Sequence, residues 1–140
     1  MARSKIEVIE QTVIDHVKTI EEEEVLIVAG RGVTKDSDIE QLEKLAKLLG
    51  GQLCFTRPMV ENGYGDTLHQ IGLSGRTVKP NLIMTFGVSG AIQFTAGMNG
   101  AETIVAVNND PNALIFNVAD YCLVEDLSAV IPRMIEKLDK

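Results

Sequence analysis

The fold is decided by one stretch, Leu82-Ile83-Met84-Thr85-Phe86-Gly87-Val88-Ser89-Gly90-Ala91-Ile92-Gln93. An apolar run of strand length ends at Gly87, and the chain turns before a predicted helix that begins at Gly90. Such a turn leaves backbone N–H groups free at the start of the helix, where the helix dipole is positive. Glycines also let a ligand approach the backbone closely, so the stretch predicts a site for a phosphate or pyrophosphate group.

The composition restricts the partners of the protein. Its length of 140 residues predicts a single domain. A formal net charge of −7 argues against a nucleic-acid partner, because phosphate backbones bind clustered Lys and Arg. No apolar run is long enough to cross a bilayer, and the N-terminus has no apolar signal-peptide core. We therefore expect a cytoplasmic protein with no nucleic-acid partner and no membrane insertion.

The two cysteines, Cys54 and Cys122, lie far apart in the sequence, each inside an apolar run. A metal site or a redox pair typically shows closer spacing. The pattern predicts two buried thiols in a reducing cytoplasm.

Further apolar runs predict buried strands beside residues 82–86. They cover residues 25–29, 52–56, 103–107 and 121–124. Apolar residues at helical spacing predict a helix from Ile39 to Leu49, and others predict a final helix up to Leu138. Strands that alternate with helices predict an α/β fold, a three-layer Rossmann-like open parallel sheet with helices on both faces.

Capping residues predict where these helices begin and end. Ser37 with Glu40 fits a capping box before the first helix, and Gly50-Gly51 stops it. Ser128 is the predicted cap of the final helix.

Residues 1–24 allow two interpretations, an N-terminal extension or an edge strand of a domain over residues 25–140. Ile6 and Val8 alternate as in a strand, whereas Val13, Ile14, Val17 and Ile20 are spaced as in a helix. His16 is isolated among polar residues.

In an open parallel sheet, ligands bind outside the carboxyl ends of the strands. The polar segments expected there contain no His–carboxylate pair, no Ser/His/Asp arrangement and no metal cluster, so we expect no catalytic residue and no metal ligand. This set of residue types is better suited to binding a nucleotide cofactor than to catalysing hydrolysis. The segments are Gly30-Arg31-Gly32, Thr56-Arg57, the long connection over residues 58–81, Gly87-Val88-Ser89-Gly90, Asn108-Asn109-Asp110, and Asp126.

Two observations weigh against stronger conclusions from these segments alone. The G-x-G-x-x-G fingerprint is absent, which argues against a dehydrogenase-type dinucleotide site. Arg31 and Arg57 are also compatible with simple surface ion pairs.

As an ordered set, the motifs of this chain are similar to those of one family, the carboxyl-terminal FAD domain of the electron transfer flavoprotein α subunit, which has the DHS-like NAD/FAD-binding fold. The resemblance covers about residues 25 to 132. The matching stretches are residues 28–32, 56–57, 60–64, 70–80, 87–93, 96–98, 106–111 and 115–121.

The resemblance implies that FAD binds in an extended pose and relays electrons, and that the protein is a carrier rather than an enzyme. Arg57 would lie against the isoalloxazine ring, the Ser74 hydroxyl would bond the flavin N5, and Ser89 to Gln93 would surround the ribityl and pyrophosphate groups. The other cofactor contacts implied are Arg31, Thr56, Gln70, Ile71, Gly72, Leu73, Gly90, Ala91, Ile92, Phe94, Asn108, Asp126 and Leu127, with Asn108 and Asp126 at the adenosine end.

The chain departs from the family pattern at three implied contacts. Phe94 stands where many members have His near the flavin C2 carbonyl, Leu73 replaces a common Gln, and Ser74 replaces a common Thr. Phe can neither donate a hydrogen bond nor carry charge, so weaker stabilisation of a one-electron-reduced flavin is implied. Phe94 also resembles a subgroup of anaerobe-type proteins linked to flavin-based bifurcation.

The family's α subunit has a further amino-terminal domain and pairs with a β subunit. The resemblance therefore implies an excised or naturally separate FAD domain. Its implied partners are the missing N-terminal α domain, the electron transfer flavoprotein β subunit and dehydrogenases, with self-association of the isolated domain as a further expectation.

Two other functions are open at this point. One is an NAD-binding enzyme of the same fold class, for which His69 is the only histidine near the long connection. The other is an assembly domain with a vestigial site. The geometry decides, because a single FAD can touch Arg57, Ser74 and Ser89 only if the three residues line one cavity.

Overall fold

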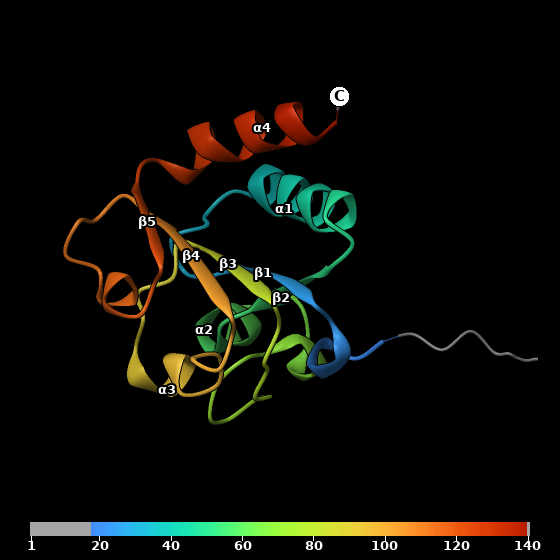
Figure 1. The fold of residues 1–140 in the computed structure, drawn as a ribbon, viewed down its shortest axis with the longest axis vertical. Helices are drawn as coiled ribbons and strands as arrows, with labels where there is room; N and C mark the ends of the chain where they lie inside the picture. Colours follow the sequence, from blue (N-terminus) through green and yellow to red (C-terminus); the bar gives the residue numbers. More distant parts are fainter. Residues whose placement is uncertain (1–17, 140) are drawn as a thin grey trace, which may run out of the picture.

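The structure, a computed structural model, describes residues 18–139 and contains a five-stranded sheet in which neighbouring strands pair in parallel (Figure 1). The strand order is β2-β1-β3-β4-β5. The predicted strands are confirmed to within one residue at each end. Their bounds are β1 (Val25–Ala29), β2 (Gln52–Phe55), β3 (Leu82–Phe86), β4 (Thr103–Asn108) and β5 (Tyr121–Val124).

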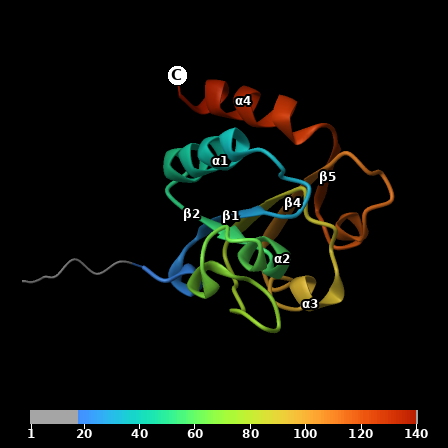
Figure 2. The ribbon, with the colours of Figure 1, turned by 180° about the vertical axis from the view of Figure 1, so that it is seen from behind.

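One face of the sheet is covered by two helices, α1 (Asp36–Leu48) and α4 (Leu127–Leu138), which lie side by side (Figures 1 and 2). Ile27 of β1 and Phe86 of β3 point toward this face, where they pack with Leu42 of α1 and Ile131 of α4. All four side chains are fully buried.

The opposite face is covered by shorter pieces of the chain. They are the 3-10 turn η1 (Ile20–Glu22), the connection that holds α2 (Arg57–Glu61) and η2 (Thr67–His69), the short helix α3 (Ile92–Thr95), and η3 (Leu114–Asn117). Leu26 and Ile83 point toward this second core, together with Ile71, Phe94 and Ile115 from the covering segments. Two apolar cores on one sheet make three layers, which confirms the predicted fold class.

The predicted caps of both long helices are wrong. α1 begins at Asp36, and the backbone N–H groups of Asp38 and Ile39 both donate to the Lys35 carbonyl, so Ser37 lies inside the first turn. The cap of α4 is Asp126, whose carboxylate accepts a hydrogen bond from the Ser128 N–H at 3.1 Å. A carboxylate before the first turn accepts hydrogen bonds from the free N–H groups as a hydroxyl does, so Asp126 takes the role that was predicted for Ser128. The predicted end of α1 at Gly50 is confirmed, with a φ of +75°.

The helix expected to begin at Gly90 begins two residues later and is short. α3 contains four residues, Ile92–Thr95, and its N-cap is Ala91. Turn bonds replace the helix after Thr95, because Gly97 packs against the backbone of Gly72 and a Cβ there would lie 2.6 Å from the Gly72 nitrogen. So short a helix has a small dipole, and any anion site here depends on individual N–H groups and cationic side chains.

The two cysteines differ in exposure. Cys54 is fully buried on the central sheet, as predicted, and burial raises the pKa of its thiol. The prediction of a buried Cys122 is wrong, because β5 is an edge strand whose four residues are all exposed.

Of the N-terminal expectations, those at Ile6, Val8, Val13, Ile14, His16 and Val17 lie outside the described residues. Ile20 is 1% exposed and joins the second core, so this segment is packed on the sheet from Lys18 onward. Among residues 18–139, no helix has the length and apolar character needed to cross a bilayer.

Candidate functional site

A cavity of about 610 Å³ lies at the carboxyl ends of β1, β2 and β3. This is the edge of a parallel sheet where ligands bind. Arg57, Ser74 and Ser89 all line it, so the three residues expected to touch one cofactor share one cavity. Its full lining is Arg31, Gly32, Thr56, Arg57, Pro58, Ile71, Gly72, Leu73, Ser74, Gly87, Val88, Ser89, Gly90, Ala91, Gln93, Phe94 and Asn108.

Four residues of the predicted site do not line this cavity. Gln70 is 4% exposed and lies behind Ser74, and Ile92 is 74% exposed on α3. Asp126 and Leu127 line a second cavity instead. Conversely, the predicted site residues did not include Gly32, Pro58, Gly87 and Val88, although Gly32, Pro58 and Val88 each directly follow or precede a predicted residue.

The second cavity has a volume of about 310 Å³ and lies between the N-termini of α1 and α4. It shares Gly32, Gly87 and Asn108 with the first, so the two cavities adjoin along the strand ends. The predicted site residues did not include five others that line this cavity, although Asn109 belongs to a segment expected at the strand ends and Ser128 was expected to cap the final helix. They are Thr34, Lys35, Asp38, Asn109 and Ser128. Asp38 is 7% exposed and accepts a hydrogen bond from the Ser128 hydroxyl at 2.7 Å.

The boundary between the cavities is a contact between two backbone turns. Gly32 follows β1, and its N–H donates to the carbonyl of Gly87 after β3 at 2.9 Å. A Cβ on Gly32 would lie 2.8 Å from the Gly87 Cα, so only glycine fits. Gly87 itself has a φ of +68°. The absence of side chains exposes the backbone of both turns to a ligand.

The turn after β3 presents unused donors. The N–H groups of Ser89, Gly90 and Ala91 find no acceptor within residues 18–139. Asn108 at the end of β4 holds the turn, because its Nδ2 donates to the Val88 carbonyl at 2.9 Å. Its Oδ1 accepts from the Asp110 N–H, also at 2.9 Å, so both polar atoms of the side chain bond the protein, while the second Nδ2 hydrogen has no acceptor among residues 18–139.

The loop over residues 70–76 forms the facing wall. Its backbone is fixed at both sides, since the Ile71 N–H donates to Phe55 of β2 at 3.1 Å and the Leu73 N–H donates to Gln93 of α3 at 2.8 Å. Ser74 accepts a hydrogen bond from Gln70 Nε2 at 3.0 Å. The wall is therefore a rigid part of the site rather than a free loop.

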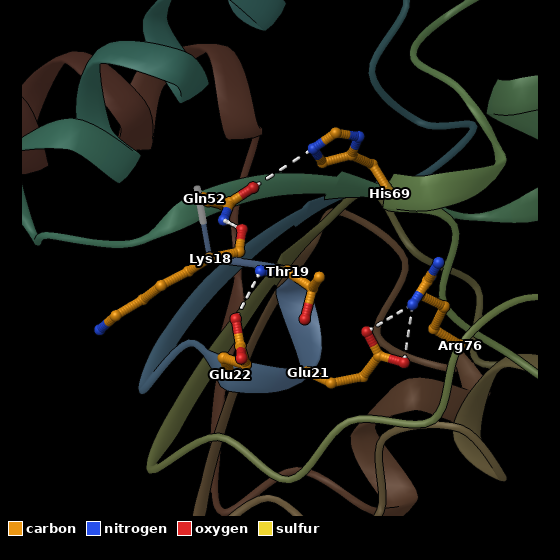
Figure 3. Close-up of polar contacts among 7 residues, drawn as sticks. All are labelled: Lys18, Thr19, Glu21, Glu22, Gln52, His69 and Arg76. Atoms are coloured by element: carbon orange, nitrogen blue, oxygen red, sulfur yellow. Dashed lines mark hydrogen bonds and ion pairs between the residues drawn. The ribbon is translucent and has the colours of Figure 1, made fainter. Parts of the chain in front are cut away.

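Polar contacts behind this loop tie it to the N-terminal segment (Figure 3). The guanidinium of Arg76 donates to both oxygens of Glu21, at 2.7 and 2.9 Å, and this bond holds the pKa of Glu21 below its usual range. His69 lies between Asp66, at 2.8 Å, and Gln52, at 3.2 Å, and Figure 3 draws the contact with Gln52. The His69 hydrogen bond lowers the pKa of Asp66. His69 serves the scaffold and does not line the cavity.

Two cations line the cavity, Arg31 after β1 and Arg57 at the start of α2. Arg57 Nε donates to Glu61 at 3.0 Å, and both side chains are about 60% exposed. Exposed pairs of this kind contribute up to about 1 kcal/mol, so a ligand anion can compete for Arg57. Within residues 18–139 there is no cluster of His, Cys, Asp or Glu that could hold a metal ion.

A parallel sheet with two adjoining cavities at its carboxyl edge defines a nucleotide-binding domain of the Rossmann-like α/β class. The family model described as "Electron transfer flavoprotein FAD-binding domain" matches residues 19–99. The chain therefore belongs to the family of electron transfer flavoprotein FAD-binding domains, which confirms the resemblance and FAD as the cofactor.

Several characterised proteins are similar to this chain. LctC, a subunit of the lactate dehydrogenase (NAD(+),ferredoxin) of Acetobacterium woodii, is 42% identical over 97% of the chain and 32% of its own length. The mitochondrial electron transfer flavoprotein subunit alpha of Arabidopsis thaliana is 49% identical over 81% of the chain and 31% of its own length. FixB of Clostridium saccharobutylicum is 42% identical over 83% of the chain and 35% of its own length. The chain thus spans about a third of the length of these relatives.

The residues present fit FAD. The unused N–H groups of the turn at Ser89–Ala91 and the guanidinium of Arg31 suit a diphosphate. Apolar walls from Ile71, Val88 and Phe94 suit a flat ring, and the second cavity offers room for a nucleoside. The family assignment and the local chemistry agree.

Proposed function

We propose that this protein is the FAD-binding part of an electron transfer flavoprotein α subunit and relays electrons between a dehydrogenase-type donor and an acceptor. The observation that carries the proposal is the single cavity that joins Arg57, Ser74 and the turn at Ser89. Bound FAD supplies the redox chemistry, and the protein binds it and sets its potential. In this role the chain is a carrier and not an enzyme.

The diphosphate of FAD binds at the turn after β3. The free N–H groups of Ser89, Gly90 and Ala91 donate to its oxygens, and Arg31 neutralises part of its charge. Gly90 and Asn108 keep this turn in shape, the first through its φ of +93° and the second through its bond to Val88. Gln93, which lines the cavity, continues the site along the ribityl chain, whereas Ile92 is exposed outside it.

The flavin ring lies between Arg57 and the wall over residues 70–76. A fixed guanidinium beside the ring favours the forms that carry negative charge, through Coulomb attraction. The Ser74 hydroxyl would bond the flavin N5, and Thr56, Ile71, Gly72 and Leu73 line the cavity around it. Phe94 is 6% exposed and gives the ring an apolar neighbour with no hydrogen bond.

The adenosine end occupies the second cavity. Asp126 uses one carboxylate oxygen to cap α4, which leaves the other for a ribose hydroxyl or the adenine amine. Leu127 packs beside it. Asn108 holds the strand end through its bonds to Val88 and Asp110, and its second Nδ2 hydrogen is available to the adenosine end.

We propose as partners the remainder of an α subunit, the electron transfer flavoprotein β subunit and dehydrogenases. The names of the relatives support this, since they include α subunits and a subunit of a lactate dehydrogenase. The exposed Leu73, Ile92 and Leu114 support contact with such partners or with a second copy. The two free thiols support the cytoplasm as the location.

The test is reconstitution of the purified 140-residue chain with FAD, followed by its visible spectrum and calorimetry against FAD and NAD. We expect a yellow 1:1 complex and preference for FAD over NAD. Arg133→Ala, on the exposed side of α4, serves as a control for Arg31→Ala, which should weaken binding. A folded protein that binds NAD and not FAD would refute the proposal.

A further inference from the structure

Gln70 was expected to touch the cofactor, but it lies outside the cavity lining and behind Ser74. Its side chain is 4% exposed, and its Nε2 donates to the Ser74 Oγ at 3.0 Å. Ser74 is the only polar side chain of the 70–76 wall that lines the cavity within the described part of the chain. A buried amide therefore bonds the one hydroxyl of this wall that faces the ligand.

The backbone keeps Gln70 in this position. Its N–H donates to Thr67, its carbonyl accepts from the Arg76 N–H at 2.8 Å, and Gly75 packs directly on it. A Cβ on Gly75 would lie 3.0 Å from the Gln70 Cγ, so the side chain has little room to swing away from Ser74.

The bond decides what the Ser74 hydroxyl offers to a ligand. A serine hydroxyl has one proton and two acceptor lone pairs. Gln70 Nε2 occupies a lone pair, and no group within residues 18–139 accepts the proton. The proton is therefore free to point into the cavity, and the hydroxyl acts there as a donor.

We propose that Gln70 is a positioning residue that fixes the Ser74 hydroxyl as a hydrogen-bond donor to the flavin, and so lowers the midpoint potential of bound FAD. The inference rests on the proposed function. In the oxidised ring N5 is an acceptor, whereas the two-electron-reduced ring carries a hydrogen on N5 and is a donor there. A hydroxyl held as a donor stabilises the oxidised ring more than the reduced one.

The test is a double-mutant cycle on the FAD-loaded chain, with the two-electron midpoint potential as the readout. We expect Gln70→Met and Ser74→Ala each to raise the potential. Gln70→Met should have no further effect in the Ser74→Ala background and should keep its effect in the Ser74→Thr background, which retains the hydroxyl. The cycle isolates the coupling between the two side chains.

Gln41→Met is the matched control, because it makes the same change on α1, where the buried Oε1 of Gln41 has no partner and the cavity is not involved. Its potential should equal that of the unmodified chain. If Gln70→Met does not fold, Gln70→Leu makes the same test.

The outcomes distinguish the proposed function from the role proposed for Gln70. An unmodified chain that binds no FAD contradicts the proposed function and this inference together. FAD-loaded Gln70 variants with an unchanged potential, or with an equal shift in the Ser74→Ala background, overturn this inference and leave the FAD site intact. An unchanged potential would mean that the side-chain amide of Gln70 flips freely and does not hold the Ser74 hydroxyl as a donor.

Discussion

Asn108 Nδ2 donates to the backbone carbonyl of Val88 at 2.9 Å, which joins the end of β4 to the turn after β3. The turn is therefore held from the side by a neighbouring strand rather than by the helix that follows it. α3, with four residues, is too short to impose a shape on the turn. This bond is the most direct link between the sheet and the proposed diphosphate site.

Replacing Asn108 with Ala should remove this bond and the one to the Asp110 N–H. We expect a loss of about 1–2 kcal/mol in the free energy of unfolding, because the buried Val88 carbonyl and the exposed Asp110 N–H both lose their partner. FAD affinity should fall as well, since the N–H groups of the turn lose their alignment. Urea denaturation and FAD calorimetry measure the two effects. Asn81→Ala, an exposed asparagine before β3, should leave both unchanged.

Gly90→Ala tests the turn itself. Gly90 has a φ of +93°, and a Cβ there would overlap the backbone of Ile115. Gly63 has nearly the same φ, +94°, but open space around it. Gly63→Ala should therefore cost about 1–2 kcal/mol from backbone strain alone, and Gly90→Ala clearly more, with loss of FAD binding. Equal unfolding free energies for the two variants would contradict the role given to the contact with Ile115.

Arg57→Ala should lower the midpoint potential of bound FAD, because it removes a positive charge beside the ring. The expected change is about 1 kcal/mol per electron, reduced by solvent exposure and by salt. Glu61→Gln should shift the potential upward, since Glu61 partly neutralises Arg57 through the 3.0 Å ion pair. Potentiometry at low and high ionic strength measures both. Shifts of the same sign would be incompatible with Arg57 acting through its charge.

The contact between Glu21 and Arg76 predicts a pH dependence. Arg76 holds the pKa of Glu21 below its ordinary value of 4.5, so the pair stabilises the fold above about that pH and loses this contribution as the pH falls through the lowered pKa. Glu21→Gln should cost up to about 1 kcal/mol at pH 7 and nothing in strong acid. Urea denaturation across pH 3 to 7 checks this. Glu40→Gln, on the exposed side of α1, should show no such trend.

The two thiols should react very differently. Cys122 is exposed on β5, whereas Cys54 is buried and its thiol pKa is raised by desolvation. An aromatic disulfide reagent should label one thiol quickly in the native protein and two in urea. Cys122→Ser should abolish the fast reaction. Two fast thiols in the native state would contradict the burial of Cys54.

The strands were predictable because their side chains must be apolar on both faces of a covered parallel sheet. The runs Val25–Ala29 and Leu82–Phe86 carry this signal directly. The cavity also followed from the sequence, since the carboxyl ends of parallel strands meet at one edge and bring Arg31, Thr56 and Ser89 together.

What the sequence did not predict depends on tertiary contacts. The short length of α3 follows from the packing of Gly97 on Gly72, which no local pattern encodes. The exposure of Cys122 follows from the place of β5 at the edge of the sheet, and strand order is not a local property. Likewise, Asp38 becomes buried only because α4 lies beside α1 and brings Ser128 to its carboxylate.

The backbone contact between Gly32 and Gly87 restricts how this site can vary. The space between the two turns holds no atom larger than hydrogen. Substitution of Gly32 or Gly87 would therefore disrupt the diphosphate site rather than tune it. Differences in flavin potential among proteins with this fold must therefore come from other side chains that line the cavity. In this chain that means the side chains at Arg57, Leu73 and Phe94, which can change without moving the main chain.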